Sequence, residues 1–301
     1  MSSLVPLVIL GNVNVDLVLG PLVTWPAEGT EVLVPHLEWR VGGNAGNTAL
    51  ACAALGTGAV TVSTVGADLP GQWLRQQLPE GAVRWQPTAA PTSVTAAFTH
   101  PGSERSFVTY LGHLGELSWD TVRPLLPPAR LALLAGAFLT PALRPDYPRI
   151  LRELRAAGTH CALDFGWPET GFTGDVRREV GSWLPDMTYL LINELEALHL
   201  TGQPTPELAL QDLSGQIRPG GVVAVKLGAQ GVLAAQLGET HRVAAPSVEV
   251  IDTVGAGDTW NAAFLHALLQ GAPLPLALRQ AVAVASLAIS TSPRRFGPIE
   301  V

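Results

Sequence analysis

From about residue 120 onward, short apolar segments alternate with segments of helical periodicity. The apolar segments have the length of strands and span residues 131–138, 159–164, 189–192 and 222–227. The helical patterns lie near residues 144–157, 194–200 and 206–217. Strands that alternate with helices in this way form a parallel sheet with helices on both faces. The sequence therefore predicts an α/β fold whose ligands bind beyond the carboxyl ends of the strands.

The N-terminal segment predicts another buried strand of this sheet. Residues 4–10 form a continuous apolar run that ends at Gly11, as is typical of a central parallel strand. Asn12, Asn14 and Asp16 then alternate with apolar residues, which gives the following strand one polar face. That face is either a solvated edge or a row of groups that bind a polyhydroxylated ligand. We expect neither a signal peptide nor a membrane span here, because the apolar run is short and no basic segment precedes it.

Three further segments predict a small β lid. Residues 30–40 have the pattern of a strand, and Pro35 places it at a sheet edge. Residues 95–98 and 106–110 flank a turn at residues 100–103, which is a hairpin signal. We expect a single domain over residues 1–301, with a lid formed from about 12–40 and 92–110. The alternative for the lid segments is a peripheral extension of the sheet.

A glycine-rich turn precedes an alanine-rich helix near the start of the chain. The turn reads Gly42-Gly43-Asn44-Ala45-Gly46-Asn47, and the helix follows over residues 48–55. The two leading glycines allow a ligand to approach the backbone closely. Asn47 is either a helix cap or a group that binds a substrate hydroxyl.

A second turn of small residues lies near the other end of the chain. Residues 252–260 read Asp-Thr-Val-Gly-Ala-Gly-Asp-Thr-Trp, and a helix is predicted over residues 259–269. Gly255, Ala256 and Gly257 leave room for backbone N–H groups to converge on an anion at the helix N-terminus. Asp258 is then placed as a general base beside that anion site. The alternative is an ordinary acidic residue in the first turn of a helix.

Charge and cysteine content exclude several classes of function. The formal net charge is −7, and the Lys and Arg residues form no cluster in the sequence. We therefore expect neither nucleic acid nor an anionic membrane as the main partner. Cys52 and Cys161 are too far apart in sequence to suggest a disulfide framework or a zinc site, and they fit a cytoplasmic location.

The two glycine-rich motifs, together with Asn193-Glu-Leu-Glu196 and Lys226-Leu-Gly228, resemble the ribokinase-like (PfkB) carbohydrate kinase family. The order and spacing of these features agree over essentially the whole chain. The resemblance implies a Rossmann-like α/β core with a small β lid, and an ATP-dependent kinase that acts on a primary alcohol of a sugar or sugar derivative. It also implies a homodimer formed through the lid.

The resemblance also implies roles for particular residues of this chain. Asp258 matches the catalytic base, and the anion hole matches Gly255, Ala256 and Gly257. The sugar-contact positions correspond to Asp16, Gly42, Gly43 and Asn47, with Asn14 beside them. Asn193 and Glu196 match the motif that organises Mg²⁺ around the phosphates, while Lys226, Gly228 and Gly231 match the loop beside the nucleotide. Asp252 and Thr253 match a region where some members bind a monovalent cation such as K⁺.

Departures from the family pattern concern the substrate and the nucleotide. Residues 134–138 lack the glutamate that ribokinase uses on ribose, and Asn44 stands where ribokinase has a lysine, so ribose is disfavoured. Val282 replaces an asparagine near adenine. The alternatives that remain are a nucleoside kinase of the same fold and a non-catalytic small-molecule binder. A nicotinamide dehydrogenase is disfavoured, because residues 11–16 lack the Gly-x-Gly-x-x-Gly turn.

Overall fold

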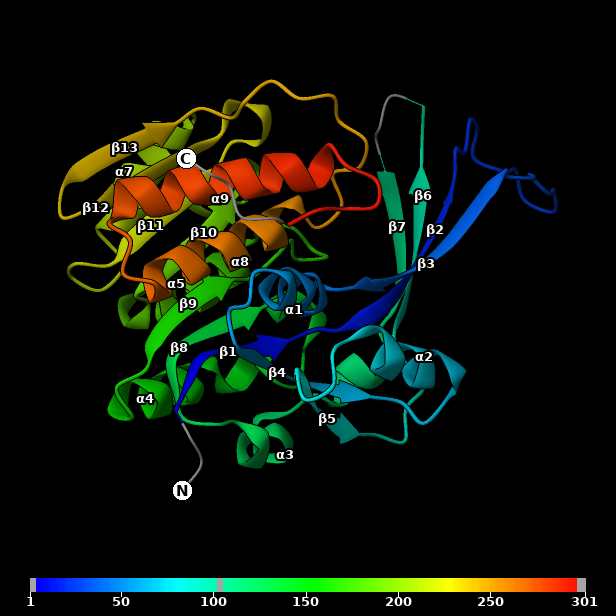
Figure 1. Cartoon of the computed structure of the whole chain (residues 1–301), viewed down its shortest axis with the longest axis horizontal. Helices are drawn as coiled ribbons and strands as arrows, with labels where there is room; N and C mark the ends of the chain where they lie inside the picture. Colours follow the sequence, from blue (N-terminus) through cyan, green and yellow to red (C-terminus); the bar gives the residue numbers. More distant parts are fainter. Residues whose placement is uncertain (1–3, 102–104, 297–301) are drawn as a thin grey trace.

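The computed structural model describes residues 4–101 and 105–296, and within these ranges the chain forms two sheets (Figure 1). The larger sheet has nine strands in the order β13-β12-β11-β10-β9-β8-β1-β4-β5. Its strands are β1 (Val5–Gly11), β4 (Ala59–Val65), β5 (Val83–Pro87), β8 (Ala129–Ala135), β9 (His160–Asp164), β10 (Tyr189–Asn193), β11 (Val222–Lys226), β12 (Val232–Gln236) and β13 (Glu239–Val243).

The pairing within the larger sheet brings several chemically useful residues to one edge. Seven adjacent strands, in the sheet order β11-β10-β9-β8-β1-β4-β5, pair in parallel. Strands β12 and β13 extend the sheet in antiparallel fashion. In register, Ala135 of β8 faces Asp164 of β9, and Asn193 of β10 faces Lys226 of β11. Because the carboxyl ends of parallel strands lie at the same edge, these side chains converge there.

Helices cover both faces of the larger sheet. They are α1 (Asn44–Ala54), α2 (Leu69–Gln77), α3 (Trp119–Val122), α4 (Tyr147–Ala156), α5 (Gly174–Trp183), α6 (Glu194–Thr201), α7 (Pro206–Ser214), α8 (Ala256–Leu269) and α9 (Leu274–Ile289). Alternate residues of each strand enter opposite cores: Leu7 and Ile9 pack with α1, α8 and α9, whereas Val8 and Leu10 pack with α3 to α7. This two-sided burial explains the continuous apolar strands. No helix within the described ranges is both long and apolar enough to cross a membrane.

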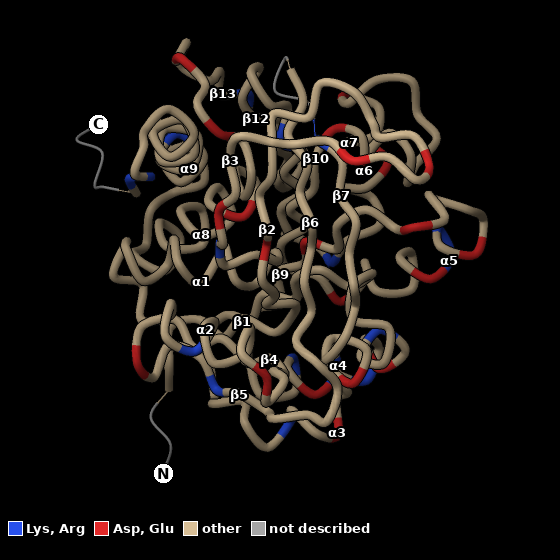
Figure 2. Tube along the Cα trace, turned by 90° about the vertical axis from the view of Figure 1, so that its right-hand side faces the viewer, with Lys and Arg blue, Asp and Glu red and all other residues tan. Residues whose placement is uncertain are grey.

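The smaller sheet projects from one side of the core, and we call it the lid. Its strands are β2 (Asn14–Gly20), β3 (His36–Gly42), β6 (Val94–Thr99) and β7 (Arg105–Tyr110), in the order β3-β2-β6-β7. Figure 2 looks onto this sheet, whose strands lie on the side nearest the viewer and run side by side roughly up and down the picture. Only Asn12 and Val13 separate β1 from β2. The polar face of β2 is therefore fixed to the carboxyl end of a central core strand.

The predicted α/β fold with a parallel sheet and helices on both faces is confirmed, but some element boundaries were wrong. The strand predicted over residues 30–40 begins only at His36, because Pro35 precedes β3 instead of lying within it. The helix predicted from residue 259 begins at Ala256, so Asp258 is already inside α8. Strands β4, β5, β12 and β13 and helices α2, α3, α5 and α9 have no counterpart among the predicted elements.

The packing of α8 gives a test of the core. Phe264 is fully buried and stacks on Trp260, with ring centroids 4.9 Å apart. We expect Phe264→Ala to lower the free energy of unfolding by about 3–5 kcal/mol, because it removes buried area and leaves a cavity. Urea denaturation measures this value. Phe107→Ala, which truncates a ring that is 58% exposed, is the matched control. Equal losses in the two variants would contradict the packing described here.

Candidate active site

A cavity of about 690 Å³ lies between the lid and the carboxyl edge of the larger sheet. We call it the lid cavity. Its walls combine polar side chains, four aromatic rings and the turn before α8; they are Asn12, Asn14, Asp16, Gly43, Asn44, Asn47, Thr95, Arg105, Phe107, Thr109, Gly136, Phe138, Leu139, Phe165, Gly166, Trp167, Glu196, Thr253, Val254, Gly255 and Asp258. This lining suits a ligand with several hydroxyl groups.

A second cavity, of about 510 Å³, lies on the other side of the same turn. We call it the α8–α9 cavity. It is lined by Lys226, Gly228, Ala229, Gly231, Ala245, Pro246, Ser247, Val248, Val250, Thr253, Ala256, Gly257, Trp260, Val282, Ala285, Ser286 and Ile289. Thr253 lines both cavities. The turn before α8 is therefore the boundary at which ligands in the two cavities would meet.

Asp258 is buried at this boundary and is held by the first turn of α1. Asn44 Nδ2 donates to Asp258 Oδ1 at 3.1 Å, and Asn47 Nδ2 donates to Asp258 Oδ2 at 3.0 Å. Burial, and then the nearby negative charge of Asp164, raise the pKa of Asp258 to about 7, although Lys226 and the two amides favour the charged form. The carboxylate is thus oriented, and its pKa suits a general base near neutral pH.

Close packing at the site depends on glycine at two positions. Gly255 is the N-cap of α8 in the left-handed conformation, and a Cβ there would lie 2.9 Å from the Asn47 Cγ. A Cβ on Gly42 would lie 2.0 Å from Asp16 Oδ1. In both places a larger residue would displace a polar side chain of the site. The space beside Gly42 is filled by Asp16, so this glycine makes room for a side chain of the chain itself.

The turn before α8 only partly matches the expected anion hole. The Ala256 N–H donates to Thr253 O at 3.2 Å. Gly257 and Asp258 are the second and third residues of α8, and N–H groups in this first turn have no partner within a helix. Together with the helix dipole, these N–H groups favour an anion at the α8 N-terminus.

Lys226 reaches toward this turn from the end of β11. Its Nζ lies 2.9 Å from Asp164 Oδ2 and 3.1 Å from Asn261 Oδ1, and Asn261 Nδ2 donates to the same Asp164 oxygen at 2.5 Å. A Cβ on Gly257 would lie 3.4 Å from Lys226 Nζ, so the ammonium group is close to the α8 N-terminus. Lys226 therefore adds a positive charge where a phosphate in the α8–α9 cavity would lie.

Asn193 and Glu196 form a helix cap at the start of α6. The Asn193 N–H donates to Glu196 Oε2 and the Glu196 N–H donates to Asn193 Oδ1, both at 2.9 Å. This reciprocal pair is a capping box, which stabilises α6 irrespective of any ligand. Burial, with a further contribution from Asp164, raises the pKa of Glu196 to about 7. Glu196 also lines the lid cavity, so one residue combines a structural position with access to a ligand.

The polar face of β2 lines the lid cavity. It is therefore not a solvated sheet edge, which was the other alternative from the sequence. Asn14 Nδ2 donates to Asp16 Oδ1 at 2.7 Å and to Thr95 Oγ1 at 3.2 Å. Burial raises the pKa of Asp16 to about 6, against the opposing effects of Asn14 and Arg40. Both polar atoms of the buried Asn12 amide lack a hydrogen-bond partner among the described residues. These groups are available to hydrogen-bond a ligand.

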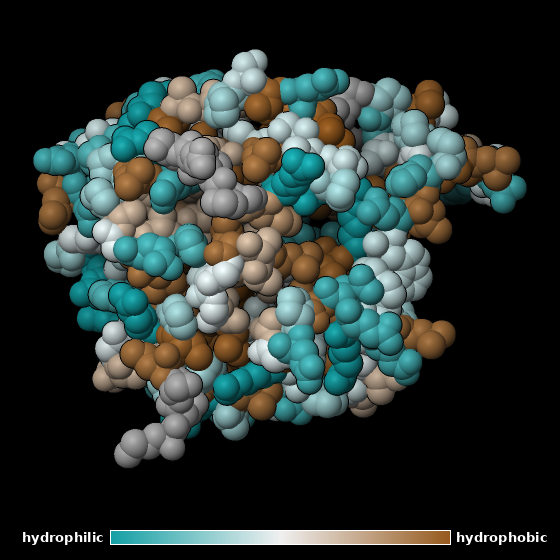
Figure 3. All heavy atoms as spheres, in the orientation of Figure 1, coloured by the Kyte–Doolittle hydropathy of each residue, from teal (hydrophilic) through white to brown (hydrophobic). Residues whose placement is uncertain are grey.

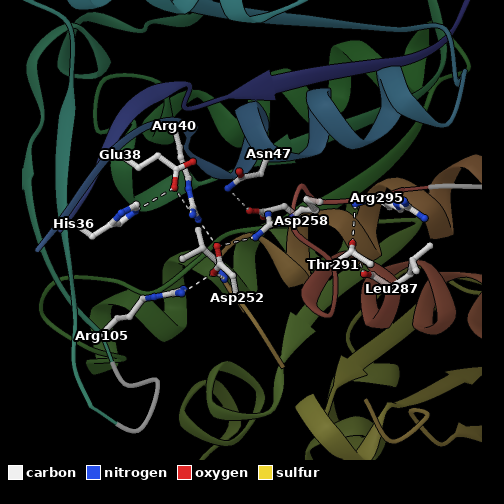
Figure 4. A network of polar contacts seen from close by, with 12 residues as sticks. His36, Glu38, Arg40, Asn47, Arg105, Asp252, Asp258, Leu287, Thr291 and Arg295 are labelled. Atoms are coloured by element: carbon white, nitrogen blue, oxygen red, sulfur yellow. Dashed lines mark hydrogen bonds and ion pairs between the residues drawn. The ribbon is translucent and has the colours of Figure 1, made fainter. Parts of the chain in front are cut away.

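Asp252 faces a different environment from Asp258. Arg40 and Arg105 of the lid both donate to its carboxylate (Figure 4). Arg294 Nη2 lies 3.2 Å from Asp252 Oδ2. Burial alone would raise its pKa, but the Val254 N–H and the arginines lower it to about 2. Three guanidinium groups oppose the binding of a further cation at this carboxylate.

The structure brings most of the predicted site residues to the two cavities. Those that line the lid cavity are Asn14, Asp16, Gly43, Asn47, Glu196, Thr253, Gly255 and Asp258. Those that line the α8–α9 cavity are Lys226, Gly228, Gly231, Thr253, Ala256 and Gly257. Gly42, Asn193 and Asp252 line neither cavity.

Two exposed tryptophans of the lid region lie outside the lid cavity. Trp25 packs on Phe98 and Trp39 on Trp73, with ring centroids 5.1 and 5.7 Å apart, and neither tryptophan lines the lid cavity. Asp164 and Asn261 were missed as site residues. Asp164 is the last residue of a predicted strand, so the rule that ligands bind at the carboxyl ends of strands would have found it.

Two adjoining cavities at the carboxyl edge of a parallel sheet, with a buried carboxylate at their boundary and a lid over one of them, define a two-substrate enzyme of the α/β class. The sequence places the chain more closely. It belongs to the family described as "pfkB family carbohydrate kinase", whose profile matches residues 6–298. The chain is accordingly an ATP-dependent phosphotransferase of the carbohydrate kinase type.

Individual relatives agree with this assignment. The chain is 27% identical to a ribokinase of Arabidopsis thaliana over 298 residues, covering 94% of this chain and 76% of that protein. It is also 27% identical to a 2-dehydro-3-deoxygalactonokinase of Haloferax volcanii over 279 residues, covering 87% and 86% of the two chains. Among solved structures, the adenosine kinase of Sinorhizobium meliloti superposes with a TM-score of 0.81 at 25% identity, covering 96% of this chain and 95% of that one.

The coupling between Asp164 and Asp258 gives a test of the site electrostatics. We expect Asp164→Asn to lower the pKa of Asp258, because it removes a negative charge that disfavours ionisation and leaves Lys226 without its carboxylate partner. Titration of the Asp258 carboxyl carbon by NMR measures the pKa. Asp146→Asn, at the start of α4, is the control and should leave it unchanged. An Asp258 pKa that stays the same or rises in Asp164→Asn would refute the coupling.

Proposed function

We propose that this chain transfers the γ-phosphoryl group of ATP to a hydroxyl, in particular a primary alcohol, of a sugar or sugar derivative. The observation that carries the proposal is the buried Asp258 carboxylate, which lies at the boundary of the two cavities and is oriented by Asn44 and Asn47. Phosphoryl transfer requires the attacking hydroxyl and the phosphate to be aligned on either side of such a base. The lid cavity takes the acceptor, and the α8–α9 cavity takes the nucleotide.

In the proposed reaction, Asp258 accepts the proton of the acceptor hydroxyl. The hydroxyl oxygen forms a bond to the γ-phosphorus as the bond from that phosphorus to the β–γ bridging oxygen breaks, and ADP leaves. In the turn at 255–257 the Ala256 N–H already donates to Thr253, so the remaining N–H groups and the ammonium of Lys226 hold the negative charge of the phosphoryl group. Gly228 and Gly231 border the nucleotide. Closure of the lid excludes water, which limits hydrolysis of ATP in the absence of an acceptor.

Mg²⁺ fits the residues at the edge of the sheet. It takes most of its ligands from water and phosphate oxygens, so a dedicated cage of side chains is not required. Within residues 4–101 and 105–296, no group of three or more His, Cys, Asp and Glu side chains is arranged to hold a metal. Glu196 and Asn193 would hold water molecules that are bound to the ion, and the ion would neutralise phosphate charge. We place no monovalent cation on Asp252, because its carboxylate already binds three arginines.

A nucleoside acceptor is the second candidate. Four aromatic side chains line the lid cavity, namely Phe107, Phe138, Phe165 and Trp167, and such rings are able to stack on a base. The similarity to an adenosine kinase is compatible with this acceptor. Sugars and sugar acids are compatible with the named activities of the ribokinase and the 2-dehydro-3-deoxygalactonokinase. The same assay distinguishes these acceptors.

We expect ADP release from MgATP with at least one acceptor in a panel of hexoses, pentoses, 2-dehydro-3-deoxy sugar acids and nucleosides. Asp258→Asn should lower kcat by about 10²–10⁴-fold, because the hydroxyl loses its proton acceptor. Asp212→Asn on α7 is the control and should retain full activity. If Asp258→Asn turns over as fast as the native enzyme, Asp258 is not the base; if no acceptor supports ADP release, the kinase proposal fails.

The lid also supports a proposed homodimer. On β7, Arg105, Phe107 and Thr109 line the lid cavity, so Val108 and Tyr110 lie on the opposite, outer face. Leu37 and Trp39 of β3 are exposed as well. Figure 3 shows apolar residues along the right-hand edge of the molecule, where the lid projects. An exposed apolar sheet face of this kind is typical of a subunit interface.

Sedimentation equilibrium tests the dimer. We expect twice the mass of a single chain, and Leu37→Glu should shift the equilibrium toward monomer because it places a charge in the apolar face. Leu208→Glu, at an exposed position of α7, is the matched control and should leave the mass unchanged. A native protein that sediments as a monomer at micromolar concentration would remove this proposal.

A further inference from the structure

The contacts of Asp252 form an arginine cluster at the rim of the lid cavity. Arg40 of β3, Arg105 of β7 and Arg294 after α9 all reach the Asp252 carboxylate. Arg40 also binds Glu38, with Nη2 2.6 Å from Oε2. In Figure 4, Arg40 and Arg105 extend from the lid toward Asp252, beside the Asn47–Asp258 pair. The arginine cluster is thus adjacent to the proposed catalytic base.

Positive charge exceeds negative charge in this arginine cluster. Among the described residues that form these ion pairs, three guanidinium groups face two carboxylates, Asp252 and Glu38. Burial, together with repulsion from Arg40 and Arg105, lowers the pKa of Arg294 despite the attraction of Asp252. The ion pairs of the cluster alone therefore leave one positive charge in excess, and Asp16 and Asp258 of the lid cavity also attract Arg40 and Arg294.

Arg105 is the arginine that connects the cluster to the lid cavity. Its side chain lines the cavity and is only 13% exposed. Nη2 lies 2.5 Å from Asp252 Oδ1, whereas the buried Nε has no hydrogen-bond partner among the described residues. A guanidinium group presents several N–H donors in a plane, which matches the two oxygens of a carboxylate or phosphate. Arg105 is therefore able to bind an anion in the cavity while it retains Asp252.

We propose that Arg105 forms an anion subsite in the lid cavity, and that the acceptor is an acidic sugar derivative that carries a carboxylate or phosphate group. This inference rests on the proposed kinase function and specifies its substrate class. The hydroxyl that reacts lies at Asp258. The polar groups of Asn12, Asn14 and Asp16 bind the hydroxyls that lie between the reacting hydroxyl and the anion. The anion is at the lid end of the acceptor, where it also holds the lid against the core.

Three acceptors test the subsite: fructose, which is neutral, 2-dehydro-3-deoxygluconate, which carries a carboxylate, and fructose 6-phosphate. We expect the native enzyme to have a higher kcat/KM for one of the two anionic compounds than for fructose. Arg105→Gln should raise KM for that compound about 10- to 100-fold, the loss expected for a charge-assisted hydrogen bond, and change kcat/KM for fructose less than about threefold. Which anion responds identifies the group as a carboxylate or a phosphate.

Two further variants separate anion binding from a role in holding the lid. Arg294→Gln removes a partner of Asp252 that does not line the lid cavity, so it should affect neutral and anionic acceptors equally. Arg105→Lys keeps the charge and should recover part of the affinity for the anion. Circular dichroism checks that each variant is folded. If Arg105→Gln reduces activity on fructose and on the anionic acceptors by the same factor, Arg105 only holds the lid and the inference fails.

Calorimetric binding of the same compounds without ATP distinguishes this inference from the proposed function. Anion binding that is lost in Arg105→Gln, without ADP release from any acceptor, supports the subsite and overturns the kinase proposal. ADP release with neutral sugars or nucleosides, and no detectable binding of either anionic compound, overturns the subsite and leaves the kinase proposal intact.

Discussion

The burial of the Asp258 carboxylate at the N-terminus of α8 is the constraint on which the site depends. A buried carboxylate needs hydrogen-bond partners, and Asn44 and Asn47 of α1 supply them. These contacts fix α1 against α8, and both helices pack on the same face of the larger sheet. Since β3 leads directly into α1, the position of the lid follows from the same contacts. The same contacts therefore orient Asp258 and fix the packing of α1, α8 and the lid.

Much of the core and of the site followed from the sequence, because both depend on local pattern and on the geometry of parallel sheets. The apolar run at residues 4–10 indicated a buried strand, and β1 is central in the sheet. The motifs around Asn193 and Lys226 follow neighbouring strands, and the register places the two residues opposite each other. The carboxyl-end rule applies equally to Asp164, yet this residue belongs to no recognised motif and was not selected. Pattern alone therefore locates the edge of a site better than it identifies all of its members.

The arginine cluster was not predictable in the same way. Arg40, Arg105 and Arg294 belong to two lid strands and to the segment after α9, and they meet only because the chain folds back on itself. Arg40 is 212 residues from Asp252, and no local periodicity links positions so far apart. The resemblance to the family implied a bound monovalent cation at Asp252, whereas arginine side chains supply the positive charge there. Long-range ion pairs depend on the packing of whole elements, which a single sequence does not specify.

Asp252 and Asp258 show how the surroundings assign different roles to two identical side chains six positions apart. The arginines and the Val254 N–H hold the pKa of Asp252 at about 2, so its carboxylate is a weak base that stays charged. Burial and the neighbouring Asp164 hold the pKa of Asp258 at about 7, so it can accept a proton at neutral pH and release it again. Asp252 joins the lid to the core, and Asp258 lines the lid cavity. Because the turn at 253–257 connects them, a movement of the lid that shifts Asp252 also acts on the N–H groups and the base at the start of α8. The lid and the proposed base are thus connected through a segment of five residues, so an acceptor that drew the lid toward the core would act on both.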